Sequence, residues 1–178
     1  MMLMAGTTYM FRKAGMLSAD GRCKALDATA DGYVRSEAAG VMLLSAAPLI
    51  EDSQSLVLLA GAAVNQDGRS SSLTAPNGPS QQEVIRAALR TAGAGPAQVV
   101  GLQMHGTGTS LGDPIEIGAA AAALLEHSGE QRRGAFQRFT LLGSKSSLGH
   151  AEPASGLMGI ACLFNVSIIK YFFPQTLN

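Results

Sequence analysis

The sequence predicts an α/β fold in which a buried, mostly parallel or mixed sheet is flanked by helices. Short apolar runs of strand length alternate with polar loops and with longer segments of helical pattern. Hydrophobic residues make up 47% of the 178 residues and charged residues 15%, which suffices for a packed core. The length fits one domain or a large piece of one, and we expect no second domain.

The first third of the chain combines one helix with two candidate strands. Residues 9–17 have the pattern of a short helix that ends at a polar turn, 18–21. The runs 40–46 and 56–64 are apolar and of strand length, and residues 48–54 connect them. We therefore expect two strands of the sheet here.

A long loop and an amphipathic helix come next. Residues 65–79 are rich in asparagine, glycine, serine and proline, and loops of this length are often functional. Ser80 and Glu83 have the spacing of a capping box, and apolar residues follow at helical spacing through about Thr91. Gly93 is the expected helix stop.

The next unit is a strand followed by a loop and a helix. The strand is predicted over 99–104. Asp113 is placed to cap the helix, which has Pro114 at its first position and runs through Leu125. Residues 128–138 are polar and are expected to form a loop.

The last part of the chain repeats this order. A short strand is predicted over 140–143, a tight loop over 145–150, and an apolar helix over 153–169. The helix is marginal in length for a bilayer span and is interrupted by Ser155 and Asn165, so we expect a buried core helix. Both ends of the chain are abrupt, which suggests a piece of a larger domain.

Composition and charge exclude several classes of function. Thirteen basic and thirteen acidic residues cancel, so no nucleic-acid footprint is indicated. The two cysteines, Cys23 and Cys162, are too few for a disulfide framework. No basic region precedes an apolar one at the N-terminus, as a signal peptide requires. We therefore expect a cytoplasmic protein that binds neither nucleic acid nor membranes.

Two loops that follow predicted strands each carry a histidine beside glycine. His105 begins the loop 105–109, His-Gly-Thr-Gly-Thr, and His150 ends the loop 145–150. Ligands of open α/β sheets bind outside the carboxyl ends of the strands, where such loops gather. Two interpretations stay open at this point: ordinary loop residues, or one shared site.

The first loop also allows a rival interpretation. Gly106, Gly108 and Gly112 suggest a dinucleotide-binding turn, although their spacing departs from the usual fingerprint. Asp113 would repel the pyrophosphate at the helix N-terminus. No strand that ends in an acidic residue is predicted roughly 20 residues later. An NAD(P)-dependent oxidoreductase is therefore the weaker hypothesis.

The motif at 105–109 and the following Gly-Asp-Pro-Ile-Glu belong to a longer series of motifs. The others lie at 21–24, 31–35, 63–69, 73–79, 143–146 and 149–152. With these motifs, in this order and over nearly the whole chain, the sequence resembles the later part of the ketosynthase (β-ketoacyl synthase) domain of type I polyketide synthases and related fatty-acid synthases.

This resemblance implies a partial thiolase-like layered α/β fold, with residues 1–178 forming a ketosynthase domain truncated at both ends. It implies a decarboxylative Claisen condensation of acyl and malonyl-type thioesters in polyketide or fatty-acid biosynthesis. The implied partner is an acyl carrier protein, whose phosphopantetheine arm carries the substrate. No cofactor or metal is expected to bind directly, and the full-length parent is expected to be a homodimer.

The resemblance also assigns roles to six residues. The implied catalytic residues are His105, His150 and Lys145, the phosphopantetheine-binding residues Thr107 and Thr109, and the supporting residue Glu152. Two imidazole N–H donors would stabilise negative charge on the thioester oxygen. A nearby lysine would keep them neutral, with its own charge met by Glu152. The alternative for Lys145 and Glu152 is an ordinary surface pair.

The family's nucleophilic cysteine lies in a Cys-Ser-Ser-type turn that this sequence does not contain. Cys162 falls in the apolar helix, where cysteine behaves as a small hydrophobe. Cys23 matches a family cysteine that is not the nucleophile. We therefore expect this polypeptide alone to be inactive. The alternative is a non-catalytic ketosynthase-like module for dimerisation or carrier-protein docking.

Overall fold

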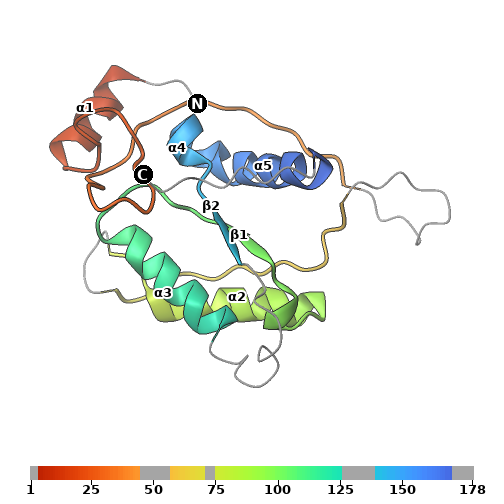
Figure 1. Ribbon diagram of the computed structural model, residues 1–178. Coiled ribbons are helices and arrows are strands. Elements are labelled where there is room, and N and C mark those ends of the chain that lie inside the picture. The colour runs from red at the N-terminus through yellow and green to blue at the C-terminus, as the bar shows by residue number, and fades with distance from the viewer. Residues whose placement is uncertain (1–3, 45–56, 71–74, 126–138, 170–178) are drawn as a thin grey trace.

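The computed structural model describes residues 4–44, 57–70, 75–125 and 139–169 (Figure 1). In chain order the elements are α1 (Ala5–Lys13), α2 (Gly78–Ala92), the 3-10 helix η1 (Pro96–Gln98), β1 (Gly101–Gln103), α3 (Gly112–Leu124), β2 (Thr140–Leu142), α4 (Lys145–Leu148), the 3-10 helix η2 (Glu152–Ala154) and α5 (Ser155–Ile169). β1 and β2 pair in parallel, with Gly101 opposite Thr140. The α/β class and the parallel pairing are therefore confirmed.

Helices cover both sides of this strand pair. In Figure 1, α2 and α3 lie together below the strands, while α4 and α5 lie above them. Ala120, Ala123 and Leu124 of α3 are buried, and Ile85 and Leu102 are among the side chains packed against them. The small alanine side chains let α3 approach its neighbours closely. Because β1 and β2 run parallel, the two loops that follow them emerge at the same end of the sheet.

The helix predicted over 9–17 exists, but it begins and ends about four residues earlier. Gly15, just beyond the helix, adopts a left-handed backbone with φ of +69°, which suits glycine at a helix end. Leu17 then forms a parallel bridge with Tyr33. The distant pairing of this segment ends the helix before its apolar pattern does.

The capping box predicted at the start of α2 is wrong. Asn77 is the N-cap, and its Oδ1 accepts the backbone N–H of Ser80 at 3.1 Å. The Ser80 hydroxyl instead donates to the carbonyl of Gln66 at 2.7 Å. Because the loop before α2 folds back over the helix N-terminus, it takes the Ser80 side chain away from capping. The predicted stop at Gly93 is confirmed, with φ of +62°.

Two further boundaries differ from the prediction. Asp113 lies inside the first turn of α3, where Leu111 is the N-cap and makes no side-chain cap. The tight loop predicted over 145–150 begins with the single turn α4. The predicted polar loop 128–138 lies outside the described residues. Asp113 is thus free to place its carboxylate elsewhere, as described below.

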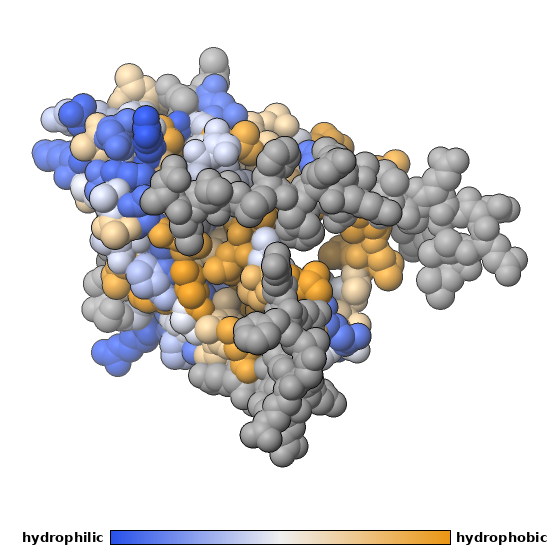
Figure 2. All heavy atoms as spheres, viewed as in Figure 1, coloured by the Kyte–Doolittle hydropathy of each residue, from blue (hydrophilic) through white to orange (hydrophobic). Residues whose placement is uncertain are grey.

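The apolar runs 40–46 and 56–64 do not form strands within the described residues. Residues 40–44 and 57–64 have no regular structure, and the connection 48–54 lies outside the described part of the chain. Val41 is 98% exposed, Leu43 96% and Val64 96%. Figure 2 shows hydrophobic surface across the centre of the molecule. A strand requires a hydrogen-bonded neighbour, and the described residues provide none here.

The apolar helix predicted over 153–169 corresponds to η2 and α5, but it is not a buried core helix. Gly159 packs against β1, where an added Cβ would lie 3.3 Å from Cγ of Gln103. Ile160 is 40% exposed and Leu163 38%. One face of α5 therefore packs against β1, and the opposite face of this helix is exposed. No helix in the described part is long and apolar enough to cross a membrane.

We expect the isolated 178-residue chain to associate in solution. The exposed side chains of Val41 and Leu43 are apolar, and surfaces of this kind favour association. Replacing both by lysine should shift the chain towards monomer without altering its circular dichroism, because neither side chain is packed. Size exclusion with light scattering measures the change. A sharp monomer peak for the unchanged chain would contradict this expectation.

Candidate active site

Two carboxylates of α3 hold the backbone of the loop 105–109. The backbone N–H groups of His105 and Gly106 donate to Glu116, at 2.5 and 2.9 Å. Asp113 accepts the N–H of Gly108 with both oxygens, each at 3.2 Å. The N–H of Gly108 is buried and needs such a partner. The Gly-Asp-Pro-Ile-Glu motif therefore shapes the histidine loop that precedes it.

Asp113 also joins this loop to an earlier segment. Its Oδ2 accepts the backbone N–H of Leu26 at 3.0 Å, and the residue is 4% exposed. Gly108 has φ of +77°, and an added Cβ would lie 2.4 Å from the backbone nitrogen of Lys24. Only glycine fits where the two segments touch. The motifs at 21–24 and 105–109 are thus one structural unit.

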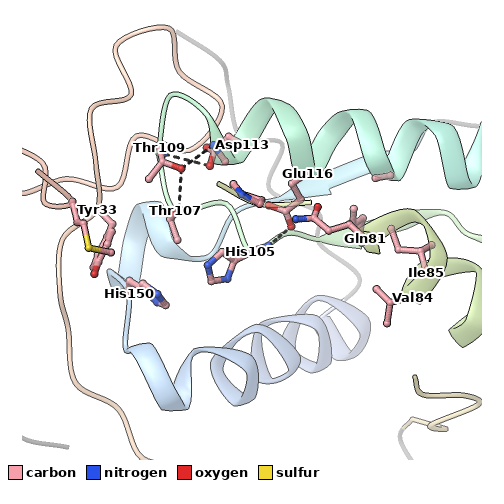
Figure 3. Close-up of a pocket in the computed structure, with 15 residues that line it drawn as sticks. Tyr33, Gln81, Val84, Ile85, His105, Thr107, Thr109, Asp113, Glu116 and His150 are labelled. Atoms are coloured by element: carbon pink, nitrogen blue, oxygen red, sulfur yellow. Dashed lines mark hydrogen bonds between the residues drawn. The ribbon is translucent and has the colours of Figure 1, made fainter. Parts of the chain in front are cut away.

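The structure brings the two histidines together, as the shared-site interpretation predicts. The ring centroids of His105 and His150 are 5.1 Å apart, with an angle of 88° between the ring planes. Tyr33 packs edge-on against His150 at 5.1 Å. Figure 3 shows the two imidazoles side by side near Thr107, with His150 next to Tyr33. The two loops therefore converge on one site.

The backbone around His150 is fixed on both sides. Its N–H donates to the carbonyl of Val34 at 2.8 Å, and its own carbonyl accepts the N–H of Ser36 at 3.0 Å. Gly149 has φ of +71°, and an added Cβ would lie 2.9 Å from Cβ of Ser36. Nδ1 of His150 accepts the backbone N–H of Glu152 at 3.2 Å. The ring proton of neutral His150 is therefore on Nε2.

Both imidazoles are neutral near pH 7. Burial, followed by the neighbouring His105 and Lys145, lowers the pKa of His150 to about 4. The pKa of His105 is also lowered, first by desolvation of its ring and then by the charge of Lys145, although the residue as a whole is exposed in this chain. The lysine acts in the predicted direction, but desolvation is the larger cause. Neutral rings can donate N–H groups to a developing negative charge.

We expect an NMR titration to find the pKa of His150 near 4 and that of His105 below its usual value of 6.5. A chain with His127→Gln leaves only these two histidine signals. Since an unfolded histidine binds its proton near pH 6.5, the folded state should lose stability as the pH falls from 6.5 to about 4. Protonation of both rings at pH 6.5 or above would contradict this assignment.

The prediction that Glu152 meets the charge of Lys145 is wrong. Glu152 pairs with Arg35, through distances of 2.6 Å to Nε and 3.1 Å to Nη2. A guanidinium fork matches both carboxylate oxygens, which an ammonium group cannot do. Lys145 is only 5% exposed, so the surface-pair alternative is also wrong. Burial lowers the pKa of Lys145, against the opposing effect of the Glu116 carboxylate.

A cavity of about 480 Å³ lies in front of the histidines. Its polar lining includes Tyr33, Gln81, His105, Thr107, Thr109, Asp113, Glu116 and His150. The hydroxyls of Thr107 and Thr109 lie 3.4 Å apart. Lys145 instead lines a smaller cavity of about 210 Å³ that shares His105. Four of the six predicted residues thus line this cavity, and Lys145 and Glu152 do not.

The sequence patterns assigned no role at this site to Tyr33 and Glu116, and gave Asp113 only the role of a helix cap. Tyr33 contacts His150, and Asp113 and Glu116 organise the loop that carries His105. All three lie in motifs that had been noticed, at 31–35 and after 105–109. The available signal was the position of two carboxylates one helical turn apart, directly after a loop rich in backbone donors.

Neither cysteine has the environment of a nucleophile. Cys23 is 3% exposed, and its sulfur accepts the N–H of Val34 at 3.2 Å. Burial raises its pKa, which disfavours the reactive thiolate. Cys162 is half-buried in α5. Cys23 therefore fits the structural role expected from the sequence, whereas Cys162 is less buried than the predicted core helix requires.

The geometry also argues against a dinucleotide at the loop 105–109. A phosphate at such a turn is bound by free backbone N–H groups. Here the N–H groups of His105, Gly106 and Gly108 already donate to the carboxylates of α3. Their negative charge would also repel a pyrophosphate. These N–H groups are therefore not available to bind the cofactor of an NAD(P)-dependent oxidoreductase.

Comparisons with known proteins give a consistent result. A family model described as the C-terminal domain of β-ketoacyl synthase matches residues 56–178, and one for the N-terminal domain matches residues 1–48. A spectinabilin polyketide synthase protein of Streptomyces orinoci is 50% identical over 172 residues. Mycoketide-CoA synthase of Mycobacterium tuberculosis is 47% identical over 167 residues. The matches cover 94% and 91% of this chain but only 4% of each relative.

Solved structures with similar folds include ketosynthases. The oxazolomycin ketosynthase domain of Streptomyces albus matches with a TM-score of 0.74 and 30% identity, over 92% of this chain and 28% of that one. The ketosynthase from module 6 of the bacillaene synthase of Bacillus subtilis matches with a TM-score of 0.74 and 28% identity, over 93% and 30%. The thiolase-like fold predicted from the motifs is confirmed.

Proposed function

Because this chain belongs to the β-ketoacyl synthase family, we propose that it supplies the two-histidine part of a ketosynthase site for decarboxylative Claisen condensation. The observation that carries the proposal is the convergence of His105 and His150, 5.1 Å apart, on one cavity. The chain spans only 4% of the length of these relatives. The condensation is therefore proposed for the complete ketosynthase domain, to which this chain contributes the two histidines. Residues 1–178 are a partial ketosynthase domain on this proposal.

The proposed chemistry places charge where the histidines are. When a malonyl-type thioester loses carbon dioxide, the electrons of the broken C–C bond form an enolate, and its negative charge resides on the thioester oxygen. The Nε2–H of His150, together with an N–H of His105, donates to that oxygen. The enolate carbon then attacks the acyl thioester. A preorganised donor of this kind lowers the barrier by about 2.7–4 kcal/mol.

The remaining residues support the substrate. Thr107 and Thr109 offer hydroxyls to the phosphopantetheine arm of an acyl carrier protein, and both line the cavity. Lys145, which lines a second cavity with His105, adds through its positive charge to the desolvation that favours neutral imidazoles. The carrier protein is the proposed partner, and the parent protein is proposed to be a homodimer in the cytoplasm.

A second candidate is a non-catalytic ketosynthase-like module for dimerisation or carrier-protein docking. The observation that favours it is that these 178 residues contain no Cys-Ser-Ser-type turn to hold an acyl thioester. The two candidates differ in one measurable respect. Only a ketosynthase requires that His105 and His150 support condensation once a nucleophilic cysteine is provided.

We expect the isolated chain to form no condensation product. A chimeric ketosynthase should do so when this chain replaces the segment that it matches in the Streptomyces orinoci protein. The assay supplies acyl and malonyl carrier proteins and detects the product by mass spectrometry, with the unaltered Streptomyces ketosynthase as control. Turnover by the isolated chain would overturn the first expectation. A folded but inactive chimera would favour the non-catalytic module.

A further inference from the structure

We propose that Arg35 is a positioning residue, which acts through the backbone of Glu152 to keep the ring proton of His150 on Nε2. The catalytic consequence of this inference rests on the proposed function, but the effect on the ring proton does not. Four observations connect Arg35 to the imidazole: its burial, its fixed side chain, the backbone conformation of Glu152 and one hydrogen bond.

The guanidinium of Arg35 is held on several sides. The residue is 8% exposed, and its Nε and Nη2 donate to the two carboxylate oxygens of Glu152. Nη1 donates to the hydroxyl of Thr8 at 2.7 Å, and the group lies 5.2 Å from the ring centroid of Phe11. A bidentate ion pair with these additional contacts fixes the orientation of both side chains. The carboxylate of Glu152 is therefore held against a rigid support.

The backbone of Glu152 needs such support. Its φ is +47°, and among the described residues only Leu26 is another non-glycine residue with positive φ. This conformation is unfavourable for a residue with a side chain and persists only where the surroundings impose it. Pro153 follows directly and disfavours the ordinary helical alternative for Glu152. The pair with Arg35 thus stabilises an otherwise strained residue.

This strained conformation directs the Glu152 N–H at His150. The N–H donates to Nδ1 of the imidazole at 3.2 Å. Nδ1 can accept this bond only while it carries no proton, so the proton of the neutral ring is on Nε2. The other side of the turn is held by the backbone bonds of His150 to Val34 and Ser36, the residues on either side of Arg35. Arg35 therefore supports both the backbone and the protonation state of His150.

The test measures the imidazole directly. In the 178-residue chain with Val41→Lys, Leu43→Lys and His127→Gln, 15N shifts of labelled histidine report which nitrogen of His150 is protonated. With Arg35 present, Nδ1 should have the shift of an unprotonated nitrogen. With Arg35→Gln, both nitrogens should move towards averaged shifts. Arg90→Gln removes an exposed pair with Glu83 and is the matched control, expected to change nothing.

A double variant separates positioning from loss of stability. Glycine adopts positive φ without strain, so Arg35→Gln with Glu152→Gly should restore the shifts of the unaltered chain. Circular dichroism reports whether each variant is folded. Unchanged His150 shifts in folded Arg35→Gln would overturn the proposal, and so would failure of the double variant to restore them. If the shifts behave as expected while the chimeric ketosynthase is inactive, the proposed function fails and the positioning role stands.

Discussion

Replacing His150 by alanine in the chimeric ketosynthase is expected to lower the rate of malonyl decarboxylation by about 10²–10³-fold. The ring lies 5.1 Å from His105, and its N–H is directed by the bond from Glu152. Alanine removes a donor that is fixed before the reaction begins, and water in the cavity would have to reorganise to replace it. His105→Ala should have a similar effect.

Release of carbon dioxide from malonyl carrier protein measures this loss without requiring condensation. His150→Gln, which keeps an N–H donor, should retain more activity than His150→Ala. The double alanine variant should lose less than the product of the two single losses, because residues that act on one oxygen are not additive. An unchanged rate in His150→Ala, with the protein folded, would remove the histidine from the mechanism.

The second large effect concerns stability. Asp113→Ala is expected to lower the free energy of unfolding of the chimeric ketosynthase by about 2–3 kcal/mol, since the buried Gly108 donor left without a partner costs about 1–3 kcal/mol and the half-buried donors of Leu26 and Thr109 add to this loss. The carboxylate accepts the N–H groups of Leu26 and Gly108, and its Oδ1 lies 3.4 Å from the nitrogen of Thr109. With its removal, the segment 21–26 separates from the loop that carries His105.

Thermal unfolding of the chimera measures this effect as a lowered midpoint. Asp113→Asn should also be destabilising, because its amide N–H₂ would face one or more of the same donors. Glu83→Ala is the control: it removes an exposed carboxylate whose pair with Arg90 contributes about 0–1 kcal/mol. If Asp113→Ala and Glu83→Ala lowered the midpoint equally, the hydrogen bonds of Asp113 would not be what stabilises this loop.

Much of the fold could be predicted from local patterns. The end of α2 at Gly93, the strand over 140–142 and the apolar helix near the C-terminus follow from features that lie within a few residues of one another. The two histidines were predicted in equivalent loops because each follows a strand and adjoins glycine. Parallel strands place such loops at one end of a sheet, so their meeting follows from the order of elements.

Other features depended on partners far away in the sequence. The partner of Glu152 is Arg35, 117 positions earlier, and Leu26 lies 87 positions before Asp113. Ser80 matches a capping box locally, yet its hydroxyl bonds a loop that only the folded chain brings near. The runs at 40–44 and 57–64 have strand composition but no neighbour in the described residues. By itself the sequence determined helical periodicity, the turns and the family motifs. The tertiary structure alone decided which charge meets which, because a hydrogen bond depends on distance in space.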